Sequence, residues 1–186
     1  LMNYLRNFTP TLEQFSVDEC FMDMTGTNYL YKDYIKLAHE IKDNIRRDLD
    51  VIICPSNIYI PYYKGKYDFK LGSQNLYINN ITGECTSRCL KSLGVSYALI
   101  GHYERKYYLN EDSSLINLKI KDAIKNNIVP IVCFGESKEE KELLKTGDVL
   151  VKQLKEYFKD IDVKEDIIIA YEPGYSIGTN LIPTNK

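Results

Sequence analysis

The sequence has no long hydrophobic run and no strong excess of charge of one sign. Among its 186 residues, 24 are Lys or Arg and 26 are Asp or Glu, which gives a formal net charge of −2. The basic residues are spread along the chain, whereas a nucleic-acid-binding protein usually gathers them on one face. No apolar stretch approaches the roughly 20 residues of a membrane-spanning helix, and the N-terminus has no signal-peptide pattern. Composition therefore predicts a cytoplasmic globular protein that binds a small molecule or a protein, with no membrane and no nucleic acid as partner.

Closely grouped cysteines are also missing. The five cysteines, Cys20, Cys54, Cys85, Cys89 and Cys133, are scattered along the chain. A disulfide framework or a four-ligand zinc site needs tighter grouping. Cys85 and Cys89 lie one helical turn apart, but two thiols alone do not make such a site. The sequence therefore predicts buried or half-buried reduced thiols and no metal ion at the cysteines.

The chain lacks the GxGxxG turn of dinucleotide-binding folds, but from about residue 50 onward it contains short apolar runs. These runs are VIIC (51–54), FKLGS (69–73), YALIG (97–101), VPIVCFG (129–135) and DIIIAY (166–171). Because they are apolar nearly throughout, they predict strands buried on both faces of a parallel sheet, with helices outside. Such units either close into a barrel or form an open doubly wound sheet. Periodicity does not separate these two architectures.

Amphipathic segments lie between the later runs. One predicted helix has Ile116, Ile120, Ala123 and Ile124 on a single face, and the next has Leu150, Leu154, Tyr157 and Phe158. The first 49 residues differ in character. LEQFSVDECFMDMTGT (12–27) predicts two strands, and a helix with Leu37 on its apolar face follows. We interpret residues 1–49 as a β-hairpin plus helix that precedes an α/β region over residues 50–186.

Polar and turn-forming residues follow the predicted strands at their carboxyl ends. They are Pro55, Ser56, Gln74, Asn75, His102, Glu104, Gly135, Glu136 and Glu172. In parallel α/β proteins the loops at this edge converge on ligands. His102 and Glu172, at the ends of different strands, are therefore candidates for an electrophile and a base. Taken one at a time, such residues are more often structural, so the residues alone leave both interpretations open.

Three ordered stretches reduce this ambiguity. GHYERK (101–106), VCFGES (132–137) and AYEPGYSIGT (170–179) resemble three consecutive signatures of the triosephosphate isomerase family. VIICPSNIY (51–59), LGSQN (71–75) and TGECTSRCLKSLGVSYALIG (82–101) are similar to earlier parts of that family, in the same order. The resemblance covers residues 50–186 and implies a (β/α)₈ barrel. Because such a barrel needs about 250 residues, we expect an incomplete barrel of mostly parallel strands with outer helices.

The resemblance also implies a function. Members of the family interconvert dihydroxyacetone phosphate and glyceraldehyde 3-phosphate in glycolysis and gluconeogenesis, without a cofactor. By this resemblance Glu172 is the general base, His102 is a neutral electrophile, and Glu104 is a supporting carboxylate. Asn75 and Glu84 would lie near the contact of a homodimer. The lid that closes over the site and binds phosphate would contain Pro173, Ile177, Gly178 and Thr179.

Several features of the family are replaced or missing. The family usually has Ser where this chain has Tyr103, and a large apolar residue and Trp where it has Gly174 and Tyr175. No Asn-x-Lys motif occurs in residues 1–49, and the last two βα units, which usually grip the phosphate, would lie beyond Lys186. Losing one electrostatic donor typically lowers a rate by ~10²–10³. We therefore expect a weak or inactive enzyme, and a noncatalytic chimeric remnant remains an alternative.

The N-terminal stretch resembles a different family. LEQFSVDECFMDMTGT, with DYIKLAHEIKDNIRRDL (33–49), is similar to the palm segment of Y-family DNA polymerases. There, Asp18 and Glu19 match an acidic pair that binds catalytic magnesium. This resemblance implies a further alternative, a polymerase fragment that binds Mg²⁺ and DNA. The junction near residue 50 would then be that of a natural fusion, an engineered chimera or a misassembled sequence.

Overall fold

The computed structural model describes residues 7, 11–14, 20–23, 36–37, 40, 51–65, 69–162 and 164–177. The chain divides into two compact units, one of residues 1–51 with 176–186 and one of residues 52–175. The boundary expected between residues 49 and 50 stays a prediction. No helix within the described ranges is long and apolar enough to cross a membrane.

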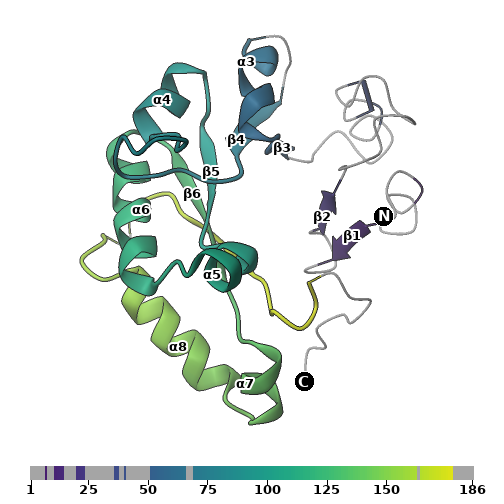
Figure 1. The fold of residues 1–186 in the computed structure, drawn as a ribbon, viewed down its shortest axis with the longest axis vertical. Helices are drawn as coiled ribbons and strands as arrows, with labels where there is room; N and C mark the ends of the chain where they lie inside the picture. Colours follow the sequence, from purple (N-terminus) through teal and green to yellow (C-terminus); the bar gives the residue numbers. More distant parts are fainter. Residues whose placement is uncertain are drawn as a thin grey trace. The chain divides into compact units, whose positions relative to one another are not determined.

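The smaller unit contains an antiparallel pair of strands. β1 (Thr11–Gln14) pairs with β2 (Cys20–Asp23), so that Thr11 lies opposite Asp23. The two β-type runs expected in this stretch therefore form strands (Figure 1). Leu37 is helical and buried, as its place on an apolar helix face requires. The acidic pair at Asp18 and Glu19 lies outside the described residues.

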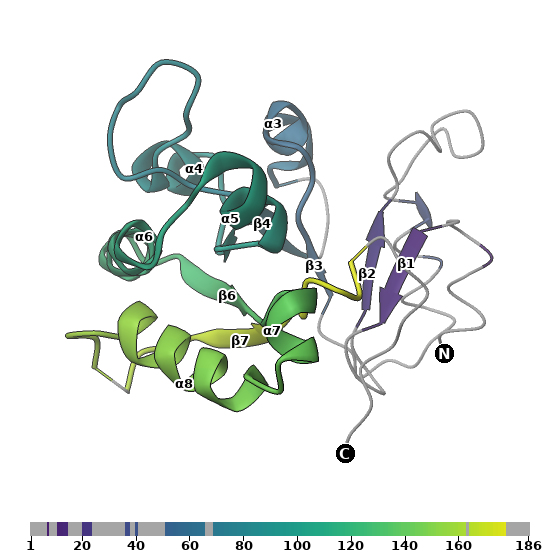
Figure 2. The ribbon, with the colours of Figure 1, turned by 60° about the horizontal axis from the view of Figure 1, so that its bottom comes forward.

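The larger unit is built on a five-stranded parallel sheet. Its strands are β3 (Ile52–Ile53), β4 (Lys70–Ser73), β5 (Tyr97–Ile100), β6 (Val129–Phe134) and β7 (Ile168–Tyr171). They lie side by side in the order β3-β4-β5-β6-β7, which is the order of the sequence (Figure 2). A doubly wound sheet reverses its strand order at a switch point, whereas a barrel does not. The unit is therefore part of a TIM-type barrel, and each expected apolar run supplies one of its strands.

Helices connect the strands and cover the sheet. They are η1 (Asn57–Tyr59), α3 (Ile60–Tyr63), α4 (Ser87–Ser92), α5 (Tyr103–Leu109), α6 (Ser113–Lys125), α7 (Lys138–Glu142) and α8 (Thr146–Tyr157). Figure 1 shows α4, α6 and α8 along the same side of the sheet. Local sequence fixes several starts: the Asp112 side chain accepts a hydrogen bond from the Leu115 amide, and Ser137 forms a capping box with Glu140.

The core lies between the sheet and these helices. Ile116, Ile120 and Ala123 of α6 are fully buried in one cluster with Ile100 of β5 and Val132 of β6. The apolar face expected for this helix is confirmed. On α8, Tyr157 is buried as expected, while Leu150 and Leu154 are half-buried. The inner face of α8 is thus less deeply covered than that of α6.

The expectation that every strand is buried on both faces is wrong for β7. β5 and β6 are buried along most of their length. In β7, Ile169 is 50% exposed and its neighbours are half-buried. The physical reason is position, because β7 ends the strand order and pairs only with β6 among the described residues. An apolar run by itself does not reveal whether a strand has a neighbour on both sides.

Candidate active site

The carboxyl ends of β5 and β7 bring His102 and Glu172 into contact. His102 lies at the start of α5, and Glu172 directly follows the last residue of β7. His102 Nε2 lies 2.5 Å from Glu172 Oε1. The Glu172 side chain is 0% exposed and that of His102 is 23% exposed. The two rim residues proposed from the sequence as base and electrophile therefore meet in one place, shielded from water on the carboxylate side.

The other ring nitrogen of His102 shows which tautomer fits the site. The backbone N–H of Glu104 donates to His102 Nδ1 at 3.3 Å, so Nδ1 serves as an acceptor. A neutral imidazole then carries its proton on Nε2, the atom that faces Glu172. His102 also sits at the N-terminus of a helix, where the helix dipole disfavours a positive charge. The geometry thus leaves Nδ1 as an acceptor and places Nε2 beside the carboxylate.

Three further groups surround the Glu172 carboxylate. Its Oε2 accepts a hydrogen bond from the backbone N–H of Tyr103 at 3.0 Å. The Cys133 thiol is close enough to feel the charge of Glu172. Burial raises the pKa of this thiol well above its usual value, and the charge of Glu172 raises it further. Cys133 therefore stays protonated beside the carboxylate.

The third group is the Lys106 ammonium, which sequence reasoning did not single out. Its Nζ is buried and has no hydrogen-bond partner among the residues that the structure describes. Burial lowers the pKa of Lys106, and the Glu172 carboxylate is the largest influence in the opposite direction. Its spacing from His102 could have predicted this position, because residues one helical turn apart lie on the same side of a helix. A buried cation thus lies within electrostatic reach of the proposed base.

The backbone of Glu172 is fixed by its neighbour strand. The Glu172 N–H donates to the carbonyl of Phe134 at 2.7 Å. A Cβ atom at Gly135 would lie 2.1 Å from the carbonyl oxygen of Glu172 and 2.5 Å from its carbonyl carbon. No side chain fits there, so glycine is needed for the two strand ends to approach each other. This approach sets the place of Glu172 on the rim.

Glu136, the next residue along, joins the same strand ends. Its buried carboxylate accepts hydrogen bonds from the Tyr171 hydroxyl at 3.0 Å and from Thr146 Oγ1 at 3.1 Å. Burial raises the pKa of Tyr171, and the Glu136 carboxylate adds to this, so the phenol remains a donor. The Glu136 carbonyl accepts from the Gly174 N–H at 2.8 Å. Glu136 therefore supports both sides of the segment that carries Glu172.

The residues proposed for the lid are only partly described. Pro173 is buried directly after Glu172. Lys141 Nζ lies 3.7 Å from the centre of the Tyr175 ring and also donates to its hydroxyl. Ile177 is half-buried and belongs to the other compact unit. Gly178 and Thr179 lie outside the described residues, so phosphate binding by them stays a prediction.

Glu104, proposed as a supporting carboxylate, contacts His102 mainly through its backbone. Its Oε2 lies 3.8 Å from His102 Nδ1, and its side chain is 63% exposed. An exposed carboxylate at this distance has little electrostatic effect, because water screens it. The catalytic support from its side chain therefore stays a prediction.

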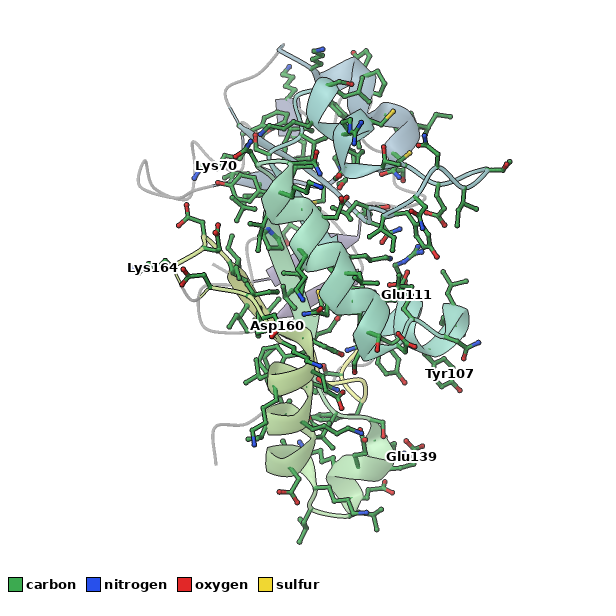
Figure 3. All side chains as sticks on the ribbon, turned by 90° about the vertical axis from the view of Figure 1, so that its left-hand side faces the viewer. Lys70, Tyr107, Glu111, Glu139, Asp160 and Lys164 are labelled. Atoms are coloured by element: carbon green, nitrogen blue, oxygen red, sulfur yellow. The ribbon has the colours of Figure 1, made fainter. Side chains whose placement is uncertain are left out.

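A buried ionic network lies behind the site, around Glu111, which Figure 3 shows where α5 and α6 adjoin. Glu111 Oε1 accepts from Arg105 Nε at 2.6 Å and from Lys119 Nζ at 2.5 Å. Lys119 Nζ also donates to Asn75 Oδ1 at 2.8 Å, and Asn75 Nδ2 lies 3.5 Å from Glu84 Oε2. The network therefore ties the end of β4 and the segment between β4 and α4, which carries Glu84, to α5 and α6.

The cysteines do not form a metal site in the described part of the chain, where no group of three or more His, Cys, Asp or Glu side chains is placed to hold an ion. Cys54, Cys85, Cys89 and Cys133 are free thiols there. Burial raises the pKa of Cys54 to about 12. Cys133 is buried, Cys54 and Cys85 are half-buried, and Cys89 is exposed, so the expectation of buried or half-buried thiols is wrong for Cys89.

Comparison with known proteins gives consistent matches. The sequence profile of the family described as triosephosphate isomerase matches residues 24–186. The triosephosphate isomerase of Alkaliphilus oremlandii (strain OhILAs) is 38% identical over 161 residues, covering 82% of this chain and 65% of that protein. That of Clostridium botulinum (strain ATCC 19397 / Type A) is 37% identical over 169 residues, covering 86% and 68%. That of Mesomycoplasma hyorhinis is 38% identical over 164 residues, covering 86% and 67%.

The family match begins closer to the N-terminus than the sequence motifs suggested. The chain spans about two thirds of the length of its curated relatives. The profile match begins at residue 24, before the start near residue 50 that the motifs suggested. The predicted helix around Leu37 therefore lies within the match. These comparisons give no support to the polymerase alternative.

Proposed function

The chain belongs to the triosephosphate isomerase family, and from this premise we propose that it interconverts dihydroxyacetone phosphate and glyceraldehyde 3-phosphate. Glu172 takes a proton from the carbon beside the carbonyl group and returns it to the neighbouring carbon. His102 donates its Nε2–H in a hydrogen bond to the substrate oxygens, on which negative charge develops in the enediolate intermediate. The substrate hydroxyl loses its proton and the former carbonyl oxygen gains one, so that the hydroxyl and carbonyl groups exchange places. The reaction needs no oxidant and no metal ion, because only protons move.

The observation that carries this proposal is the contact between His102 Nε2 and Glu172 Oε1 at 2.5 Å. It places a base and a hydrogen-bond donor side by side, with the donor's tautomer fixed by the Glu104 N–H. The contact also leaves no room for a ligand between the two groups. Substrate binding therefore has to move the carboxylate away from the imidazole, which makes a movable segment after Glu172 part of the mechanism.

Burial of the carboxylate supports the same chemistry. Glu172 is 0% exposed, so water competes little for its lone pairs once a substrate occupies the site. Exclusion of water strengthens the electrostatic interactions at the reacting carbons and protects a reactive intermediate. A solvated carboxylate at a strand end would have neither property.

The expected rate is low for this stretch of sequence. Residues 1–49 contain no Asn-x-Lys motif. Removing one electrostatic donor typically lowers turnover by ~10²–10³. A test of the function must therefore detect slow proton transfer.

Deuterium exchange provides such a test. Dihydroxyacetone phosphate is incubated in D₂O with the purified chain, and replacement of hydrogen at its hydroxymethyl carbon is followed by NMR. We expect exchange above background, lost in Glu172→Gln and reduced in His102→Gln, since both substitutions preserve side-chain size. Glu104→Gln is the matched control and should exchange within about twofold of the parent, because its exposed carboxylate is screened. Background exchange from a folded chain, or exchange that survives Glu172→Gln, would contradict the proposal.

A homodimer in the cytoplasm is part of the same proposal. By the resemblance, family members pair through the loop that contains Glu84, and here Asn75 Nδ2 lies 3.5 Å from Glu84 Oε2. Sedimentation equilibrium measures the assembly directly. A mass that stays monomeric at micromolar concentration would contradict the dimer.

A further inference from the structure

Two positions at which this chain departs from the family pattern lie against each other. Tyr103 is the first residue of α5, and Gly174 is the second residue after Glu172. A Cβ atom at Gly174 would lie 2.3 Å from Tyr103 Cε2, 2.8 Å from Cδ2 and 2.9 Å from Cζ. Real Cβ atoms do not come so close to a ring, so any larger residue at 174 requires the tyrosine ring to move.

Space, and not backbone conformation, is what requires a glycine at this position. The glycines with positive φ in the described ranges are Gly65, Gly83, Gly94 and Gly101, and Gly174 is not among them. Other residues therefore have access to its backbone conformation. The Tyr103 ring fills the volume that a side chain at 174 would occupy. A larger residue at 103 and a smaller one at 174 thus compensate each other.

The ring has support on its other side. Tyr103 stacks on Tyr107, with ring centres 5.6 Å apart and an interplanar angle of 11°, and Tyr107 meets Tyr108 edge to face at 5.0 Å (Figure 3 labels Tyr107). Aromatic pairs of this kind stabilise one another beyond their buried area. The Tyr103 ring is therefore held between the next turn of α5 and the backbone of Gly174.

Tyr103 also holds the carboxylate itself. Its backbone N–H donates to Glu172 Oε2 at 3.0 Å. The same residue thus contacts the proposed base and, through its ring, the segment that follows the base. Movement of residues 173–175 changes both contacts together.

From this arrangement we propose that Tyr103 is a positioning residue for Glu172. Its ring, supported by Tyr107, sets where the backbone at Gly174 lies and so keeps the Glu172 carboxylate beside His102. The catalytic role of Tyr103 rests on the proposed function. Its effect on the position of Glu172 can be measured even in a chain without turnover. When the lid moves, Gly174 slides past a flat ring with no side chain of its own, which lets the segment move while the ring stays in place.

A double-mutant cycle tests the proposal. The variants are Tyr103→Ser, Gly174→Val and the two together, which recreates the pairing usual in the family. The first readout is hydrogen exchange at the Gly174 amide, which donates to the Glu136 carbonyl at 2.8 Å. The second is the ¹⁵N shift of His102 Nε2, which reports its contact with Glu172. Neither readout depends on catalysis.

We expect Gly174→Val alone to speed exchange by roughly tenfold and to shift the His102 signal, because the new side chain displaces the ring. Tyr103→Ser should speed exchange by a few-fold, since the segment loses its support. The double variant should exchange more slowly than Gly174→Val alone. Tyr103→Phe keeps the ring and should match the parent, and Leu109→Ser, an exposed position on the same helix, is the matched control.

The catalytic consequence is read in the deuterium-exchange assay. Gly174→Val should lower kcat more than it raises KM, and the double variant should recover part of kcat. If the double variant's amide exchange rate changes by the product of the two single changes, the positions are not coupled and the inference is overturned. A Tyr103→Phe variant that behaves like Tyr103→Ser would also overturn it. A parent chain without turnover would count against the proposed function alone, because the amide cycle still decides the positioning role.

Discussion

Gly135 has no side chain, and this absence leaves the space that the Glu172 backbone occupies. The carbonyl of Glu172 occupies the space where a Cβ at residue 135 would be, at 2.1 Å. Unlike the contact at Gly174, this one is with backbone atoms, which have no rotamer by which to withdraw. At this position the constraint on the sequence is therefore stricter than at the lid.

Gly135→Ala should separate the ends of β6 and β7 and destabilise the fold. We expect a loss of about 1–3 kcal/mol in the free energy of unfolding, in the range of overpacked sites, and a loss of deuterium exchange at the substrate. Urea denaturation measures the first quantity. Gly147→Ala is the matched control, because nothing lies within 4 Å of its added Cβ in α8. It should gain roughly 0.5–1 kcal/mol from helix propensity, and equal effects of the two substitutions would contradict this account.

The buried ammonium of Lys106 gives the protein a pH dependence of known sign. Burial lowers the pKa of Lys106 from an ordinary value of 10.5. Between the lowered value and 10.5, the unfolded chain binds a proton that the folded chain does not. The free energy of unfolding therefore rises with pH in this window, and the cost of burial is felt in full below it.

Lys106→Met removes the charge and keeps an unbranched chain of similar length. We expect the variant to be more stable than the parent at pH 6, by about 1–3 kcal/mol, since an unsatisfied buried polar group is lost. The difference should shrink as the pH rises towards 10. Denaturant unfolding between pH 6 and pH 10 measures both trends. A Met variant that is less stable throughout would mean that the attraction between Lys106 and Glu172 outweighs desolvation.

At the scale of helices and strands, Glu111 connects α5 with α6. It is the shared acceptor of Arg105 and of Lys119, whose side chain is 0% exposed. A buried ion pair is costly to form, but removal of one partner is costlier because the other charge stays behind. The contact between α5 and α6 therefore depends on the Glu111 carboxylate more than on Arg105 or Lys119 alone.

Glu111→Gln should lower the free energy of unfolding by about 3–5 kcal/mol, the range for a broken buried pair. Glu142→Gln breaks an exposed pair with Lys138, 4.0 Å apart, and serves as the matched control. It should cost less than about 1 kcal/mol. Thermal and urea denaturation of both variants decide the matter, and a Glu111→Gln chain as stable as the control would show that the network contributes little.

Strands and helices were the most predictable elements. All five apolar runs after residue 50 became parallel strands, and the face of α6 with Ile116 and Ile120 is the buried one. Periodicity carries this information because burial of a face is a local pattern. Exposure of Ile169 escaped prediction, since it depends on whether another strand lies beside β7.

The site was less predictable than the sheet. His102 and Glu172 were found because strand ends of a parallel sheet share one rim. Lys106 was missed because a lysine on a short helix is usually solvated. The contact of Tyr103 with Gly174 could not be predicted, although the sequence showed that both residues depart from the family pattern. Only the fold places the start of α5 against the segment after β7.

For the molecule as a whole, the two ends of the sheet differ from its middle. β7 has a half-exposed apolar residue and no partner beyond β6 among the described residues. A strand with exposed apolar side chains is a site for pairing with another chain. We therefore expect the exposed Ile169 side chain to promote association of the larger unit with further copies.

Ile169→Lys should reduce this association, because a charged side chain at an edge opposes pairing. Light scattering between about 5 and 200 μM would show a rise in apparent mass for the parent and a smaller rise for the variant. Val151→Lys on α8 is the matched control, since Val151 is equally 50% exposed but lies on a helix. Association that is unchanged by Ile169→Lys would locate the contact elsewhere.

The strand order β3-β4-β5-β6-β7 has a consequence for how the chain is made. Each strand pairs with the one synthesised just before it, so on the ribosome every new βα unit finds its neighbour already present. Pairing therefore advances in the direction of translation, with short loops to close at each step. Glu172 emerges after β7 and reaches His102 only when that strand has docked. The contact between the two side chains therefore forms only after β5, β6 and β7 have paired, and its appearance reports that these strands are in place.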